Sequence, residues 1–219
     1  MAESESFRKS VKPDLTFEVD CLNIGIVFQD DGLHAAYTFS YEVSNLSGDP
    51  VPEWIHTIPE ITTKIADIKA SDAEGGLQFD LVPSNSGKSS DLRVKFRQPL
   101  PQGKSYSFQF SFEYATKSLI SQDFFSRMVH VADFAVFDVK CKRLLYEINA
   151  PKNAKILKAI PVAEHHDNTI RYDVNNVQPL EMFRYLLAYR QNRVTTKFWK
   201  WLGITIVTSI ISAYIAKLI

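Results

Sequence analysis

Two short motifs are the residues of this chain whose types and spacing most closely suggest chemistry. The tetrapeptide Ser86-Gly87-Lys88-Ser89 is similar to the end of a phosphate-binding loop, but Val82 stands where that loop requires its first glycine. His165-His166-Asp167 could begin a metal site, yet neighbours on a strand point to opposite faces, and no Cys or His pair at ligand spacing completes the site. We therefore predict no metal and no cofactor.

Nucleophilic catalysis is not indicated by the remaining histidines and cysteines. No G-x-S-x-G motif is present, and His34, His56 and His130 have no evident nucleophile as a partner. Cys21 and Cys141 lie in apolar, strand-like runs, which favours buried thiols over a disulfide. We expect that the chain is not an enzyme. A catalytic site assembled from distant strands is the weaker alternative.

Trp54 and His56 form a candidate site for binding a partner. They lie between Pro52 and Pro59, in a stretch that the sequence suggests is irregular. An exposed Trp in a loop on a rigid sheet would suit binding of a ligand or partner. The alternative interpretation is that Trp54 plugs the open end of a sandwich.

The distribution of charge separates the C-terminus from the rest of the chain. Residues 190–219 hold five basic residues and no acidic residue. Removing these five from the 25 basic residues leaves 20 against 25 acidic residues in 1–189, a net charge of −5. A body of this charge has no broad basic face for a phosphate backbone, so we expect no nucleic-acid partner.

The C-terminus has the composition of a single membrane span. Residues 201–216 carry no charge, and the eighteen residues 202–219 would make about 27 Å of helix, close to the roughly 30 Å of a hydrocarbon core. Basic and aromatic residues mark the two interfaces, namely Arg193, Lys197, Phe198, Trp199, Lys200 and Trp201 before the span and Lys217 near its end. The positive flank predicts a single-pass tail anchor with the body in the cytosol. A helix lying flat on the membrane is the alternative.

Small and hydroxyl residues gather on one side of the expected helix. At about 100° per residue they form an arc of about 140°. The arc consists of Thr205, Thr208, Ser209, Ser212, Ala213 and Ala216. Such a stripe lets helices approach closely and hydrogen-bond, which predicts a homo-oligomer through the tail. The alternative is that Thr and Ser bond their own helix and face lipid.

The elements that must carry these residues are β-strands. Polar and apolar residues alternate at 35–43, 92–96, 105–114, 170–174 and 183–189, which is typical of antiparallel sheets with one wet face. In 15–28 the alternation changes phase near Cys21, which predicts a bulge or a crossing between sheets. We expect an all-β fold of antiparallel sandwich lobes, Ig-like in general architecture, followed by the transmembrane helix.

These patterns divide the chain into six segments. Residues 1–13 form a disordered N-terminus, 14–116 the first β lobe, and 131–190 the second β lobe. Residues 117–130 connect the lobes and are partly helical, because Ile120, Phe124 and Met128 follow one another at intervals of four. A basic and aromatic stalk, 191–200, leads to the transmembrane helix, 201–219.

Two functional hypotheses follow. In the first, the β body senses a ligand or partner and controls self-association of the tail helices, as in a regulated pore or another membrane-acting effector of cell defence. In the second, the body is a protein-interaction module of an adaptor or receptor, and the tail is only an anchor. Both give the chain a lipid bilayer and an unidentified ligand or protein as partners.

Overall fold

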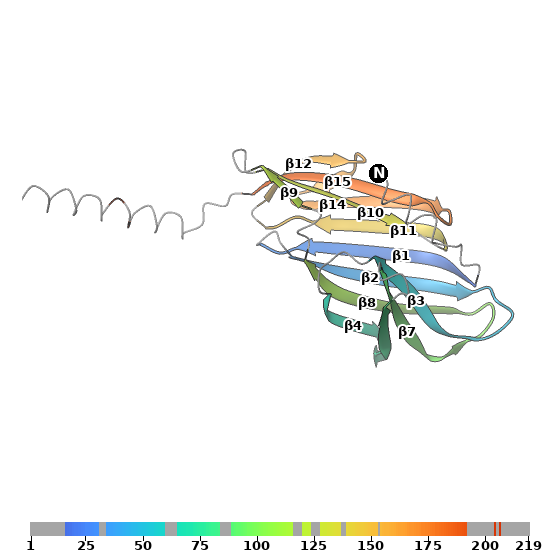
Figure 1. Cartoon of the computed structure of the whole chain (residues 1–219). Helices are drawn as coiled ribbons and strands as arrows, with labels where there is room; N and C mark the ends of the chain where they lie inside the picture. The colour runs from blue at the N-terminus through green and yellow to red at the C-terminus, as the bar shows by residue number, and fades with distance from the viewer. Residues whose placement is uncertain are drawn as a thin grey trace, which may run out of the picture.

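The computed structural model describes residues 16–30, 34–59, 65–83, 89–115, 120–123, 128–136, 139–152 and 154–191, together with Ile204 and Ile206. Every regular element between residues 16 and 191 in this part of the chain is a β-strand. The strands form three sheets, and Figure 1 shows the longest sheet running through the body. The all-β prediction is confirmed.

The largest sheet has eight strands. In spatial order they are β13 (Glu164–His166), β14 (Thr169–Val177), β11 (Lys140–Asn149), β1 (Phe17–Phe28), β2 (His34–Asn45), β8 (Ser105–Ala115), β4 (Ala66–Asp72) and β5 (Gly75–Gly76). The pairing between β1 and β11 is parallel, whereas the others are antiparallel. The register between β1 and β2 shifts between Val19 and Cys21, which confirms the predicted bulge.

Two smaller sheets cover the apolar face of the large sheet. The three-stranded sheet consists of β3 (Val51–Pro59), β7 (Ser89–Leu100) and β6 (Phe79–Pro83), and the four-stranded sheet of β12 (Ala154–Ile160), β15 (Met182–Gln191), β10 (Met128–Val136) and β9 (Ile120–Asp123). Ile24 pairs with both Phe39 and Tyr146, so these residues share one face. Phe39 contacts His56 of β3, and Tyr146 contacts Phe183 of β15.

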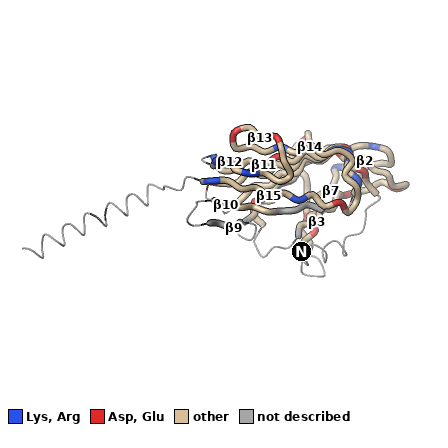
Figure 2. Tube along the Cα trace, turned by 90° about the horizontal axis from the view of Figure 1, so that it is seen from above, with Lys and Arg blue, Asp and Glu red and all other residues tan. Residues whose placement is uncertain are grey.

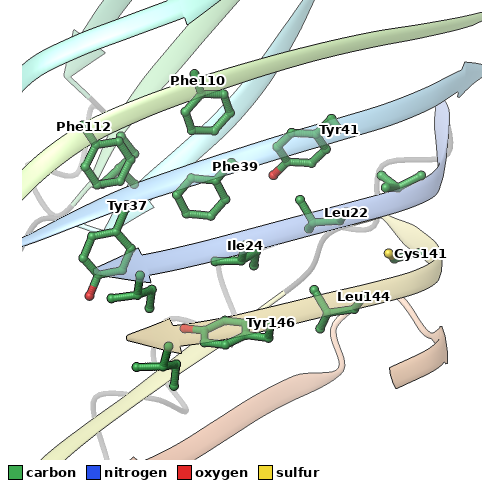
Figure 3. Close-up of a cluster of buried hydrophobic side chains, with 14 of the residues drawn as sticks. Leu22, Ile24, Tyr37, Phe39, Tyr41, Phe110, Phe112, Cys141, Leu144 and Tyr146 are labelled. Atoms are coloured by element: carbon green, nitrogen blue, oxygen red, sulfur yellow. The ribbon is translucent and has the colours of Figure 1, made fainter. Parts of the chain in front are cut away.

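Aromatic residues fill much of the space between the layers. On β2 and β8, Phe39 stacks on Phe110 with ring centroids 5.0 Å apart, and Tyr37 stacks on Phe112 at 5.6 Å. Figure 3 shows these side chains on the same side of the sheet as Leu22 and Ile24 of β1 and Leu144 and Tyr146 of β11. Alternation places one face of each strand in this core and leaves the other face wet.

The structure differs from two expectations about the middle of the chain. The segment 117–130 is not helical where it is described, because β9 and β10 pair there, with Ile120 opposite Val131. An interval of four residues is even, so it fits the two-residue period of a strand as well as a helical turn. In addition, the expected lobes 14–116 and 131–190 both supply strands to the eight-stranded sheet, which joins them through β1 and β11.

Candidate functional site

Trp54 and His56 lie in strand β3 and face the core, which corrects the expectation of an irregular loop. Trp54 is 3% exposed, and its ring lies 4.9 Å from that of Tyr41 and 5.1 Å from that of Phe17. The prolines that suggested an irregular stretch lie at the second and last positions of the strand, at its ends, where proline is tolerated. Trp54 thus fills the space between two sheets.

His56 is held in an aromatic setting. Its ring centroid lies 4.7 Å from that of Phe39 and 4.9 Å from that of Phe110, and its Nδ1 is 3.1 Å from the hydroxyl of Tyr41. Burial lowers the pKa of His56 to about 4, so the ring is neutral near pH 7. Within the described residues no group of three His, Cys, Asp or Glu side chains could hold a metal ion. The contacts of His56 are those of a packing residue.

The most extensively bonded carboxylate belongs to Asp72, beside the turn between β4 and β5. Arg97 donates two hydrogen bonds to it, at 2.7 and 2.9 Å. The Tyr106 hydroxyl and the backbone N–H of Glu74 donate as well. Hydrogen bonds from Arg97 and then Tyr106 lower the pKa of Asp72 well below its usual range. These hydrogen bonds join Arg97 and Tyr106 to the turn between β4 and β5.

The residues predicted to act at the membrane fall outside the described part of the chain. These are the interface residues Arg193, Lys197, Phe198, Trp199, Lys200, Trp201 and Lys217 and the stripe residues Thr205, Thr208, Ser209, Ser212, Ala213 and Ala216. Within the described parts we find no helical segment with the length and apolar character of a bilayer span. The helical residues Ile204 and Ile206 are exposed.

The four-stranded sheet, whose strand β15 ends at Gln191, presents a distinctive outer surface. Register places Lys155 opposite Arg190, Lys158 opposite Ala188 and Ile160 opposite Leu186. Tyr185, Leu187 and Tyr189 of β15 point to the core, so Arg184, Leu186, Ala188 and Arg190 occupy the other face. We call this outer surface the basic face, defined by Lys155, Leu157, Lys158, Ile160, Arg184 and Arg190.

The basic face combines cations with exposed aliphatic side chains. Leu157 and Ile160 are 41% and 45% exposed, and Val162, just beyond β12, is 95% exposed. Strands β12 and β15 contain four cations and no acidic residue. Figure 2 shows blue segments on both β12 and β15. This surface is suited to binding an anionic partner that also accepts apolar side chains.

Sequence reasoning missed the basic face because its residues are distant in the chain. Residues 155–160 read K-I-L-K-A-I, without clean alternation, since a bulge interrupts β12 between Ile156 and Lys158. The available signal was the absence of acids from both β12 and β15. Only the pairing of those two strands turns four scattered cations into a surface.

Comparisons with known proteins show the fold alone. No protein-family model and no curated protein matches the chain. Native leukotriene A4 hydrolase from Saccharomyces cerevisiae matches 79% of this chain at 9% identity, with a TM-score of 0.55. A second structure of the native yeast enzyme gives a TM-score of 0.53 over the same share, also at 9% identity. In both cases the chain spans 29% of the hydrolase's length, which is less than a third.

Proposed function

We propose that this chain is a C-tail-anchored membrane protein whose cytosolic β body senses a ligand or partner and controls self-association of its tail helices. The observation that carries the proposal is the short chain distance between body and tail. Strand β15 ends at Gln191, and the uncharged run begins at Trp201. The nine residues between them span about 30 Å at most. A conformational change in the body therefore takes place close to the bilayer.

The stripe of small residues in the tail favours a helix–helix contact, and the body would control whether that contact forms. A plain anchor needs only hydrophobicity, whereas Thr205, Ser209 and Ala213 at intervals of four favour close helix contact. If the body binds its ligand with different affinities in the monomeric and the assembled states, ligand binding shifts the equilibrium between these two states. The resulting activity is that of a membrane-acting effector, such as a regulated pore in cell defence.

The likeness to leukotriene A4 hydrolase supports a shared fold and does not bear on chemistry. The match covers 29% of that enzyme at 9% identity. A fold hosts many functions, and its chemistry depends on the site that it carries. In this chain the carboxylate of Asp72 and the imidazole of His56 both make contacts within the fold. We therefore propose a non-enzymatic role.

The mass of the detergent-solubilised chain, measured by light scattering that subtracts the detergent, tests the proposal. We expect a defined oligomer for the wild type and a smaller species when Thr205, Ser209 and Ala213 are all replaced by Leu. A matched control replaces Ile206, Ile210 and Tyr214 by Leu and keeps the oligomer. Resistance to alkaline carbonate extraction shows that each variant is still membrane-inserted.

The same variants decide between the effector and the adaptor. If the stripe variant inserts and keeps both the wild-type mass and the wild-type function, the tail is only an anchor, and the adaptor or receptor hypothesis replaces ours. Loss of function together with loss of the oligomer, with insertion intact, supports the effector.

A further inference from the structure

The cations of the basic face are arranged differently from those of the large sheet. On the large sheet, opposite charges are paired across strands. The distance from side-chain nitrogen to carboxylate oxygen is 2.7 Å for Arg143 and Asp173, 3.0 Å for Arg171 and Glu147, and 2.9 Å for Lys140 and Glu18. Further ion pairs join Arg93 to Glu53 and Lys95 to Asp80 in the sheet of β3, β7 and β6. The basic face instead sets Lys155 opposite Arg190.

This arrangement costs stability within the folded body. Like charges directly opposite each other on neighbouring strands are destabilising. A pairing that is unfavourable within the fold is expected at a functional site, where a partner from outside can offset it. A partner that relieved this repulsion would be anionic.

The exposed aliphatic residues narrow the chemistry of that partner. Leu157, Ile160 and Val162 are exposed beside the cations. A phosphate backbone offers no apolar surface against which these side chains could be buried. A bilayer containing anionic lipids offers both interactions, because its surface attracts Lys and Arg and its interfacial layer accepts aliphatic side chains. The basic face also begins at Arg190, one residue before the end of β15, so it is continuous with the route to the proposed membrane span.

We infer that the basic face docks on the surface of an anionic lipid bilayer and holds the β body in one orientation against the membrane. This inference rests on the proposed tail anchor. The tail keeps the body near the bilayer, and the basic face selects which side of the body meets it. Docking thus leaves the polar outer surface of the eight-stranded sheet turned toward the cytosol.

The test is quenching of a fluorophore by lipid-borne quenchers in vesicles that hold the full chain. The label is attached at Val162→Cys in a chain carrying Cys21→Ser, because Cys141 is fully buried and need not be changed. The control label is attached at Asn23→Cys, on the outer surface of the large sheet. We expect quenching at position 162 in phosphatidylserine-containing vesicles, weak quenching in pure phosphatidylcholine, and none at position 23. High salt should weaken the quenching, since docking is electrostatic.

Charge reversal supplies the matched comparison. Lys158→Glu with Arg190→Glu should lower the ratio of docked to undocked body at least tenfold, from roughly 1 kcal/mol per cation at an anionic surface. Lys69→Glu with Lys104→Glu changes the net charge equally, at exposed positions away from the basic face, and should leave the quenching unchanged.

The outcomes separate this inference from the function on which it rests. A chain that resists carbonate extraction but shows equal quenching in neutral and anionic vesicles keeps its anchor and overturns the docking face. A chain that carbonate extracts refutes the anchor, and the dependence of quenching on phosphatidylserine then decides the docking face alone. Retention of duplex DNA by the wild type but not by the reversal variant, with no quenching, would assign the face to nucleic acid and overturn lipid docking.

Discussion

Lys155 of β12 lies directly opposite Arg190 of β15 in the four-stranded sheet, so two positive charges face each other near the end of β15. These residues are 35 positions apart in the chain. Their juxtaposition opposes folding and favours an anionic partner. Under the proposed docking, the same pair links the stability of the body to its attachment.

Replacing Lys155 by Glu should stabilise the body while weakening its docking. The variant converts a repulsive cross-strand pair into an attractive one, worth roughly 1 kcal/mol in unfolding free energy. Chemical denaturation in detergent measures this gain, and the vesicle assay measures the loss of docking. Lys104→Glu, in the turn between β7 and β8, is the control and should change neither quantity. A destabilised Lys155→Glu body would contradict the assigned cross-strand register.

The neutral His56 should make the stability of the body depend on pH in a defined window. Its folded pKa of about 4 lies below the ordinary 6.5, so between these values the unfolded chain binds a proton that the folded chain does not. The stabilisation from the neutral His56 is fully present above pH 6.5 and falls as the pH drops toward 4, by about 3 kcal/mol.

His56→Phe is the variant that checks this dependence. Phenylalanine retains the ring beside Phe39 and Phe110 and has no proton to bind. Unfolding free energies measured from pH 7 to pH 4 should decline less steeply for this variant than for the wild type. His165→Gln, at an exposed position in β13, should keep the wild-type slope. Identical slopes for wild type and His56→Phe would place His56 in water.

Trp54 should behave as a core residue and not as a binding residue. Trp54→Ala should cost about 3–5 kcal/mol, whereas Trp54→Phe, which keeps a ring beside Phe17 and Tyr41, should cost about half as much. With Trp199 and Trp201 replaced by Phe, the remaining fluorescence comes from Trp54, because the chain has three tryptophans. That emission should be blue-shifted and resistant to acrylamide. Ready quenching by acrylamide would restore Trp54 as a candidate for partner binding.

Asn45 should be the least replaceable polar residue of the core. It is fully buried; its Nδ2 donates to the carbonyls of Asp49 and Leu100 at 2.9 and 2.8 Å, and its Oδ1 accepts from the N–H and hydroxyl of Ser47 at 2.8 and 2.7 Å. Asn45→Ala leaves buried groups unpaired and should cost about 3 kcal/mol in a denaturation experiment. Asn23→Ala, at an exposed position on β1, serves as the control and should change stability by less than about 0.5 kcal/mol.

Several strands were predictable because one face of each is wet. Tyr106, Phe108, Phe110, Phe112 and Tyr114 alternate with polar residues, and β8 places these aromatic residues toward the core. The phase change near Cys21 predicted the bulge in β1 for the same reason. Strands with weaker alternation were missed. Prolines near both ends obscured β3, a bulge interrupts β12, and intervals of four residues made β9 and β10 resemble a helix.

The sequence by itself determined which side of the clearly alternating strands is apolar, and it concentrated unopposed positive charge at the C-terminus. Only the tertiary structure decided that β1 pairs in parallel with β11, that both expected lobes share one sheet, and that Lys155 meets Arg190. The physical reason is that the two features depend on interactions at different separations along the chain. Alternation follows from the geometry of a single strand, residue by residue. Strand pairing follows from backbone hydrogen bonds between distant segments, which are chosen by how the whole core packs.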